Sequence, residues 1–408
     1  LITGGLLAAI GVMPGMPALP FMLLAGAVFY LARKAPNAQS LAARKAAKAE
    51  QTSNDPVSTS GDGTESGEGG TEREKLEDML PVDLLELEVG FDLVPLVDSS
   101  KGGELVERIT NIRRNLAQEM GVIIPSVHIR DNLKLKPGQY RLLLSGNTLG
   151  EGELRINKML AMDPTGVADD IDGEQVREPA FGLPARWVEP EQRDEAETAG
   201  YTVVDNATVV TTHLTELVRQ AAPDLLGRTE AQELIDILAK REPRLVDELI
   251  PNLLPLGDVI QVMRGLLLEG ISIRDLRTVL DALADNARTV KEVPTLIELV
   301  RQRMARHISA RFQDEANRVA ALALDPSSEE LFRSGEADAG AAQRMLASLE
   351  SESRNFAGVT TPPALLCAAD VRRSVAEFFT PRVPGLSVIS YQEVDPRCTV
   401  RKLGVVSS

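Results

Sequence analysis

The stretch "LELEVGFDLVPLVD", Leu85–Asp98, opens the folded part of the chain and decides its class. Leucine and valine alternate with acidic residues in it, which is the period-2 pattern of a β-strand. After Gly103, apolar residues recur at helical spacing: Leu105, Ile109, Ile112, Leu116 and Met120. Gly121 is placed to end that helix, and "SVHIRD" (126–131) and "QYRLLLSG" (139–146) predict two further strands. This order of strand, helix, strand and strand indicates a small α/β unit.

The pattern changes several times along the rest of the chain. Short strand and turn signals fill residues 157–205, and a helix follows whose start is signalled by Thr211 or Thr212. The next segment has amphipathic helical periodicity, with candidate capping boxes at Thr229–Gln232 and Ser272–Asp275. The last hundred residues again alternate between buried-strand candidates and helices, as in a parallel crossover.

These changes predict a multidomain protein that combines α/β units with an all-α unit. The expected parts are a transmembrane end (1–34), a flexible linker (35–80), a first α/β subdomain (81–156 with 206–225), a small inserted α/β subdomain (157–205), a helical subdomain (226–305) and a C-terminal α/β subdomain (306–408).

The apolar beginning of the chain predicts membrane anchoring. Residues 1–34 carry no charge until Arg33, and the basic residues follow the apolar run instead of preceding it. A secretory signal has the opposite order, so the segment is interpreted as the end of the last membrane spans. By the positive-inside rule, the residues after about 34 are expected in the cytoplasm.

Composition narrows the range of functions. The formal net charge is -16 and aromatic residues make up 3% of the chain, which argues against binding of nucleic acid. Cys367 and Cys398 are the only cysteines, and they form no metal-binding or disulfide pattern.

No catalytic, cofactor or metal site is predicted. The three histidines lie far apart in sequence; His128 is interpreted as structural and His213 as a neighbour of a helix cap. The acidic run at 169–174 lacks the ligand spacing of a calcium loop, and a solvated turn is preferred. No nucleophile motif or phosphate-binding loop is present, so nothing indicates an enzyme.

The loop "REPAFGLPARW", Arg177–Trp187, places an aromatic residue among prolines and glycine. Phe181 is therefore either a core residue of the inserted unit or an anchor that a partner captures. Pattern alone favours the core interpretation. Trp187 is expected in the core of the inserted unit.

Five stretches carry a resemblance that reverses this preference. They are "LPVDLLELEVGFDLVPLVD", "IRRNLAQEMGVIIPSVHIRDNLKLKPGQY", "EPAFGLPARW", "GYTVVDNATVVTTHL" and "LLGRTEAQELID". Together with "PGMPALPF" in the apolar beginning, they resemble the FHIPEP family, the export gates of flagellar and virulence type III secretion systems. The resemblance covers residues 1 to about 287 and is weaker beyond. The flagellar branch is the better match.

The resemblance implies a non-enzymatic role at the bacterial inner membrane. The cytoplasmic region of the family forms a ring, expected to have nine members, that receives export chaperones with their cargo and contacts other proteins of the export apparatus. A hydrophobic dimple binds the chaperones, and its motif residues here are Met162, Pro164, Glu178, Phe181, Val204, Val209 and Thr212. Many relatives carry aspartate where this chain has Glu178, which keeps the negative charge on a longer side chain.

Two alternatives remain open. One is an export gate of a virulence secretion system, whose chaperones and cargo differ. The other is a membrane-anchored regulatory enzyme, which would need His128, Asp131 and a serine to converge in the fold.

Overall fold

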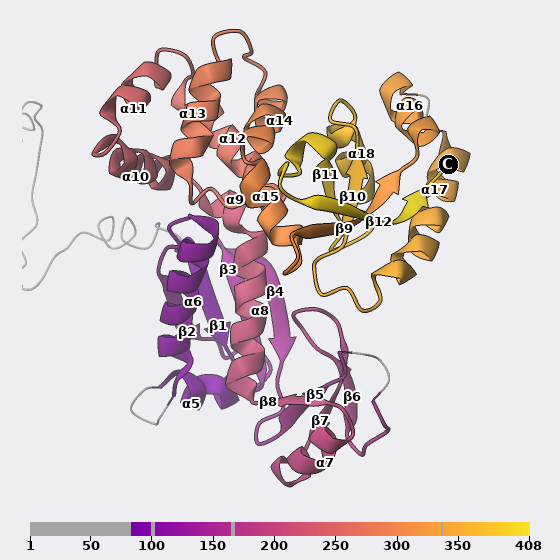
Figure 1. Ribbon diagram of the computed structural model, residues 1–408. Helices are drawn as coiled ribbons and strands as arrows, with labels where there is room; N and C mark the ends of the chain where they lie inside the picture. The colour runs from indigo at the N-terminus through magenta and orange to yellow at the C-terminus, as the bar shows by residue number, and fades with distance from the viewer. Residues whose placement is uncertain (1–82, 99–102, 165–167, 336–337) are drawn as a thin grey trace, which may run out of the picture. The chain divides into compact units, whose positions relative to one another are not determined.

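The computed structural model describes residues 83–98, 103–164, 168–335 and 338–408 (Figure 1). The first sheet has the strand order β2-β1-β3-β4. Its strands are β1 (Leu85–Val89), β2 (Val127–Asp131), β3 (Gln139–Leu144) and β4 (Asn147–Glu153). β1 runs parallel to β2 and antiparallel to β3, which confirms the predicted order of strand, helix, strand and strand. β4 extends the sheet by one more antiparallel strand.

The opening stretch is a strand for only five residues. β1 ends at Val89, and a 3₁₀ turn (Phe91–Leu93) and the short helix α5 (Val94–Val97) follow. The prediction of a strand up to Asp98 was therefore wrong beyond Val89. Pro95 lies in the first turn of α5, where its missing N–H and fixed φ angle suit a helix start better than a central strand.

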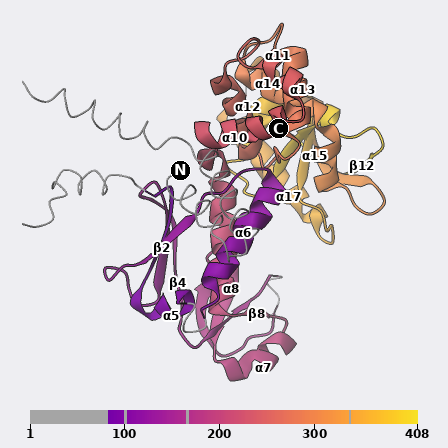
Figure 2. The same ribbon diagram turned by 90° about the vertical axis from the view of Figure 1, so that its left-hand side faces the viewer.

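Helices α6 (Leu105–Met120) and α8 (Asn206–Gln220) lie side by side against the first sheet (Figures 1 and 2). α6 buries Leu105, Ile109, Leu116 and Met120 and ends at Gly121, as predicted. The predicted start of α8 was wrong. The helix begins at Asn206, five residues before Thr211 and six before Thr212, because the Asp205 carboxylate accepts a hydrogen bond from the Thr208 N–H at 2.6 Å.

The inserted sheet has the strand order β6-β7-β5-β8 and is antiparallel throughout. Its elements are β5 (Met159–Met162), β6 (Glu174–Arg177), β7 (Pro184–Val188), α7 (Arg193–Thr198) and β8 (Thr202–Val204). A small cluster of its own contains Ala161, Val188, Tyr201 and Val203. Trp187 is buried, but it belongs to the larger cluster that contains Leu160, Val209 and Leu214. The insertion therefore shares a core with the first α/β unit.

Residues 222–312 are helical. The helices are α9 (Ala222–Leu225), α10 (Arg228–Ala239), α11 (Pro243–Leu249), α12 (Leu256–Leu268), α13 (Leu276–Asn286), α14 (Val293–Arg303) and α15 (Ala305–Phe312).

Both predicted capping boxes in this helical part were wrong. Gly227 precedes α10 without a side-chain cap, and Gln232 bonds to Asp236 instead. Asp275 itself caps α13 through the Thr278 N–H. Ser272 donates its hydroxyl to the carbonyl of Glu119 at 2.6 Å, which is a long-range contact that local spacing does not reveal.

The C-terminal part contains a fully parallel sheet in the order β11-β10-β9-β12. Its elements are β9 (Arg318–Leu324), α16 (Pro326–Ser334), α17 (Ala339–Ser353), β10 (Ala364–Cys367), α18 (Arg372–Phe379), β11 (Ser387–Ser390) and β12 (Thr399–Val406). The predicted crossover from "PPALLCAAD" through "VRRSVAEFF" to "GLSVISYQEV" is confirmed as β10–α18–β11.

The predicted membrane segment and linker, residues 1–80, lie outside the described residues. Within the part of the chain that the structure describes, no helix combines the length and the apolar character that a membrane crossing requires.

Candidate docking site

Glu178 organises the turn that joins β6 to β7. Its side chain is only 2% exposed, and its two carboxylate oxygens accept hydrogen bonds from the N–H groups of Ala180 and Phe181, each at 2.7 Å. The backbone closes the same turn, because the Glu178 N–H donates to the carbonyl of Leu183 and its carbonyl accepts from Gly182. Four bonds thus converge on one residue. They fix the backbone from which the Phe181 side chain departs.

Phe181 stands out from this turn with 62% of its surface exposed. A phenylalanine normally gains its stability by burial, so an exposed ring on a hydrogen-bonded turn is the informative exception. Arg177 adds a further tie by donating to the carbonyl of Gly182 at 2.8 Å. The turn therefore presents an apolar side chain from a defined backbone. The interpretation of Phe181 as a core residue of the insertion does not fit this exposure.

Met162 and Val204 come from the neighbouring strands β5 and β8. The two strands pair antiparallel, with Leu160 opposite Val204 and Met162 opposite Thr202. Both side chains are partly buried against the main core. Pro164 lies two residues after the end of β5 and is exposed, and Thr212 is half-buried on α8. These four residues retain surface that a partner could contact.

Val209 and Glu178 are placed differently. Val209 is 2% exposed and packs in the core beneath α8, so in this structure it offers no surface to a partner. Glu178 is equally buried, and both of its carboxylate oxygens accept hydrogen bonds from N–H groups of its own turn. Val209 therefore contributes to the core under the site, and Glu178 holds the backbone of the turn that carries Phe181.

Sequence reasoning missed a buried polar pair next to this site. The Tyr140 hydroxyl of β3 lies 2.8 Å from Nδ1 of His213 on α8, and the two rings meet edge to face at 5.8 Å. Burial lowers the pKa of His213, and the negative charge of Glu178 raises it in part. Burial also raises the pKa of Tyr140, again with a contribution from Glu178. His213 is therefore a buried member of the core and not a neighbour of a cap.

One signal for this pair was present in the sequence. Tyr140 and Leu142 share a face of the strand "QYRLLL", and His213 follows Val209 by four positions on the helix, so both polar side chains fall on buried faces. The period predicts burial, but it does not say which two side chains meet.

His128 and the acidic run at 169–174 carry exposed titratable side chains. His128 lies on the exposed edge strand β2, where its Nδ1 is 3.8 Å from the carboxylate of Asp83. Asp170 of the acidic run is exposed and pairs with Arg186. Among the described residues, no group of three or more histidine, cysteine or acidic side chains is placed to hold a metal ion.

Comparison with known proteins places the chain in a family. Residues 1–399 match the FHIPEP family. The chain belongs to that family. It is 38% identical over 343 residues to the flagellar biosynthesis protein FlhA of Bacillus subtilis, an alignment that covers 82% of this chain and 51% of the relative. The chain therefore spans about half the length of the curated FHIPEP relatives it matches, such as the Bacillus and Proteus mirabilis proteins.

Solved structures of similar proteins share the fold. The Chlamydia pneumoniae CdsV protein in its complex with CdsO superposes with a TM-score of 0.69 at 28% identity, covering 80% of this chain and 98% of that one. The nonameric SctV-C of EPEC gives a TM-score of 0.63 at 22% identity, covering 80% of this chain and 99% of that one.

Proposed function

We propose that the chain is the C-terminal portion of the export gate of a flagellar type III protein export apparatus. Its folded region docks export chaperones that carry cargo and delivers them to the membrane channel. The observation that carries this proposal is the exposed Phe181 ring on a turn held by four hydrogen bonds. Membership of the FHIPEP family and the 38% identity to a flagellar relative support the flagellar assignment.

The proposed site consists of the Phe181 ring with the exposed or partly exposed side chains of Met162, Pro164, Val204 and Thr212. An apolar anchor surrounded by half-buried apolar and hydroxyl groups is typical of the centre of a protein interface, where a few residues carry most of the binding energy. The role is non-enzymatic, because binding and release of a chaperone need a surface and no reacting group.

The proposal extends to the architecture and location of the whole protein. Residues 1–34 anchor the protein in the bacterial inner membrane. A linker connects them to four cytoplasmic subdomains with the bounds given above. They assemble as a nonameric ring, which is supported by the nonameric SctV-C of similar fold. The complex of CdsV with CdsO supports contacts with other proteins of the apparatus.

Replacing the Phe181 side chain tests the docking role. We expect Phe181→Ala to weaken binding of a late-stage flagellar chaperone–cargo complex at least tenfold, since a buried aromatic anchor contributes about 2 kcal/mol or more at an interface. Isothermal titration calorimetry measures the affinity, and circular dichroism checks the fold.

Phe91→Ala is the matched control, because Phe91 is 70% exposed in a different turn. Its affinity should equal that of the parent protein. A well-folded Phe181→Ala variant with unchanged affinity contradicts the proposal. An equal loss in both variants shows that exposed phenylalanines act nonspecifically.

A further inference from the structure

Arg177 ends β6 directly before the docking turn, residues 178–183. Its side chain is exposed, and its Nη1 donates to the carbonyl of Gly182 at 2.8 Å. A guanidinium carries five N–H donors in one plane. None of the others donates to a residue that the structure describes. Since Gly182 follows Phe181 in the chain, the cation lies next to the backbone that carries the exposed ring, with most of its donors unused.

The charge of Arg177 is not balanced by an acidic neighbour. The other basic residues of the inserted unit each form an ion pair within that unit: Lys158 with Glu189, Arg186 with Asp170 and Arg193 with Glu197. Arg177 forms no ion pair with any residue that the structure describes. Glu178 is next to it in sequence, but its carboxylate oxygens accept from the Ala180 and Phe181 N–H groups. Arg177 is therefore a cation with which a partner can pair.

The surroundings of Arg177 are acidic. Residues 157–205 contain twelve acidic residues and four basic ones. An acidic side chain of a partner is repelled over most of such a surface and attracted where the cation is unpaired. The space next to the turn is open, because a β-carbon added at Gly182 would meet no atom of the described residues within 4 Å. A carboxylate can thus reach the guanidinium alongside Phe181.

We infer that Arg177 is a specificity-determining residue of the docking site: it binds a carboxylate of the chaperone–cargo complex that lies close to the apolar side chain contacting Phe181. This inference rests on the proposed docking function and adds the chemistry of the partner to it. The guanidinium fork matches a carboxylate with two parallel hydrogen bonds. Partners that carry an apolar residue without a neighbouring acidic one bind more weakly.

Removal of the positive charge tests this recognition. We expect Arg177→Gln to bind a late-stage flagellar chaperone–cargo complex about fivefold more weakly than the parent in about 50 mM salt. In about 500 mM salt the two affinities should agree within about twofold, because counterions screen an exposed ion pair. Isothermal titration calorimetry at both salt concentrations gives the affinities, and circular dichroism checks the fold.

Arg193→Gln is the matched control. Arg193 is exposed on α7 of the same inserted unit and already pairs with Glu197 at 2.9 Å. Its replacement removes the same charge from the protein as Arg177→Gln does. The control should bind as the parent does at both salt concentrations. Equal losses in the two variants overturn the inference, since the effect then comes from net charge alone.

Arg177→Lys separates the charge from the shape of the side chain, and it also serves if Arg177→Gln does not fold. Lysine keeps the positive charge without the planar fork. We expect an affinity between those of the parent and Arg177→Gln, with a salt dependence like that of the parent. An affinity of Arg177→Lys that is as low as that of Arg177→Gln and independent of salt overturns the inference.

The salt dependence also separates recognition of a carboxylate from support of the turn. If Arg177→Gln loses the same factor in affinity at both salt concentrations, Arg177 only holds the turn through Gly182, and the inference is overturned. If Phe181→Ala binds fully while Arg177→Gln shows the expected loss, carboxylate recognition is supported and the Phe181 anchor is contradicted. If Phe181→Ala alone weakens binding, the docking function stands and the inference fails.

Discussion

At the scale of single residues, the buried side chain of Glu178 determines the conformation of the turn between β6 and β7. A carboxylate that accepts two backbone N–H bonds converts a loop of proline and glycine into a defined turn. The resemblance transferred this residue as a contact for a partner, whereas the structure gives it an internal role. Retention of negative charge matters here because the acceptor must satisfy two donors at once.

Truncation of Glu178 measures this role. We expect Glu178→Ala to lower the free energy of unfolding by about 2 kcal/mol, because two partly buried N–H groups lose their carboxylate acceptor. Glu178→Gln keeps one acceptor oxygen and should fall between that variant and the parent. Urea unfolding followed by circular dichroism gives the values.

Glu174→Ala provides the comparison on the same strand. Glu174 is exposed on β6 and pairs with Arg155 at the surface, where ion pairs contribute little. If Glu174→Ala and Glu178→Ala destabilise the protein equally, the hydrogen bonds of the turn have no special weight.

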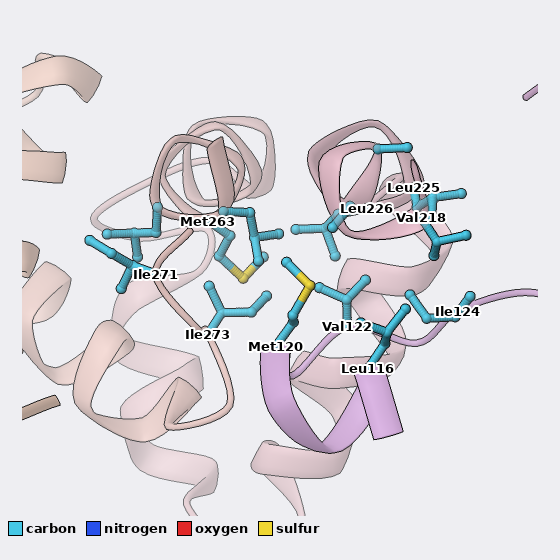
Figure 3. Close-up of a cluster of buried hydrophobic side chains, with 14 of the residues drawn as sticks. Leu116, Met120, Val122, Ile124, Val218, Leu225, Leu226, Met263, Ile271 and Ile273 are labelled. Atoms are coloured by element: carbon cyan, nitrogen blue, oxygen red, sulfur yellow. The ribbon is translucent and has the colours of Figure 1, made fainter. Parts of the chain in front are cut away.

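At the scale of elements, Gly121 both ends helix α6 and packs against the loop between α12 and α13. Gly121 ends the helix with φ at +77°, as its position in the sequence predicts. The same residue touches the loop between α12 and α13: the Ile273 N–H donates to the carbonyl of Met120, and a β-carbon at Gly121 would overlap the backbone of Arg274. Figure 3 shows Met120, Ile273 and Met263 in the apolar cluster at this junction.

Substitution of Gly121 and Gly335, which both end a helix, compares a glycine packed against other backbone with an unpacked one. Gly335 ends α16 with φ at +73°, and a β-carbon added there would meet no atom of the described residues within 4 Å. Gly335→Ala should cost about 1–2 kcal/mol for the left-handed backbone alone. Gly121→Ala should cost about 1–3 kcal/mol more, since the backbone at the junction must also move.

Thermal and urea unfolding of the two variants distinguish these contributions. Equal losses at both glycines mean that the contact between α6 and Arg274 adds nothing to stability. A larger loss at Gly121 shows that the helix end is also a tightly packed joint.

At the scale of the whole described molecule, a buried ionic cluster joins the helical part to the C-terminal sheet. Arg301 donates to both carboxylate oxygens of Glu393, at 2.9 and 2.7 Å, and to Glu269. Arg372 bonds to Glu269 and Glu298. The two arginines are 2% and 1% exposed. Burial lowers the pKa of Arg372, but its bonds to Glu298 and Glu269 raise it overall, so the charges stabilise one another.

Adjacent arginines on α18 measure what this cluster contributes. Arg372→Leu removes the buried cation that pairs with Glu298 and leaves Glu269 with Arg301 alone, and we expect a loss of about 3–5 kcal/mol in the free energy of unfolding. Arg373→Leu removes a surface partner of Glu377 and should change stability by about 0.5 kcal/mol or less.

Urea unfolding with fluorescence and circular dichroism as separate probes gives both values. If Arg372→Leu is as stable as Arg373→Leu, the cluster is not what holds the two parts together. Divergent transitions of the two probes in Arg372→Leu alone would instead show that the parts unfold separately once it is broken.

Local patterns determined most elements of this protein. The spacing of Leu105, Ile109 and Leu116 sufficed for α6, and the alternation in "QYRLLL" sufficed for β3, because burial of one face imposes a period on the sequence. Resemblance to a family then supplied Phe181 as a candidate anchor. The exposure of that residue could not be derived from the loop alone.

The remaining features depend on residues far apart in the chain. Helix starts at Asp205 and Asp275 were missed because several nearby hydroxyl and acidic residues compete as caps, and packing selects one. Tyr140 meets His213 across 73 positions, and Arg372 meets Glu269 across 103. A period reports whether a side chain is buried, and only the tertiary structure decides which buried partner satisfies its charge or hydrogen bond.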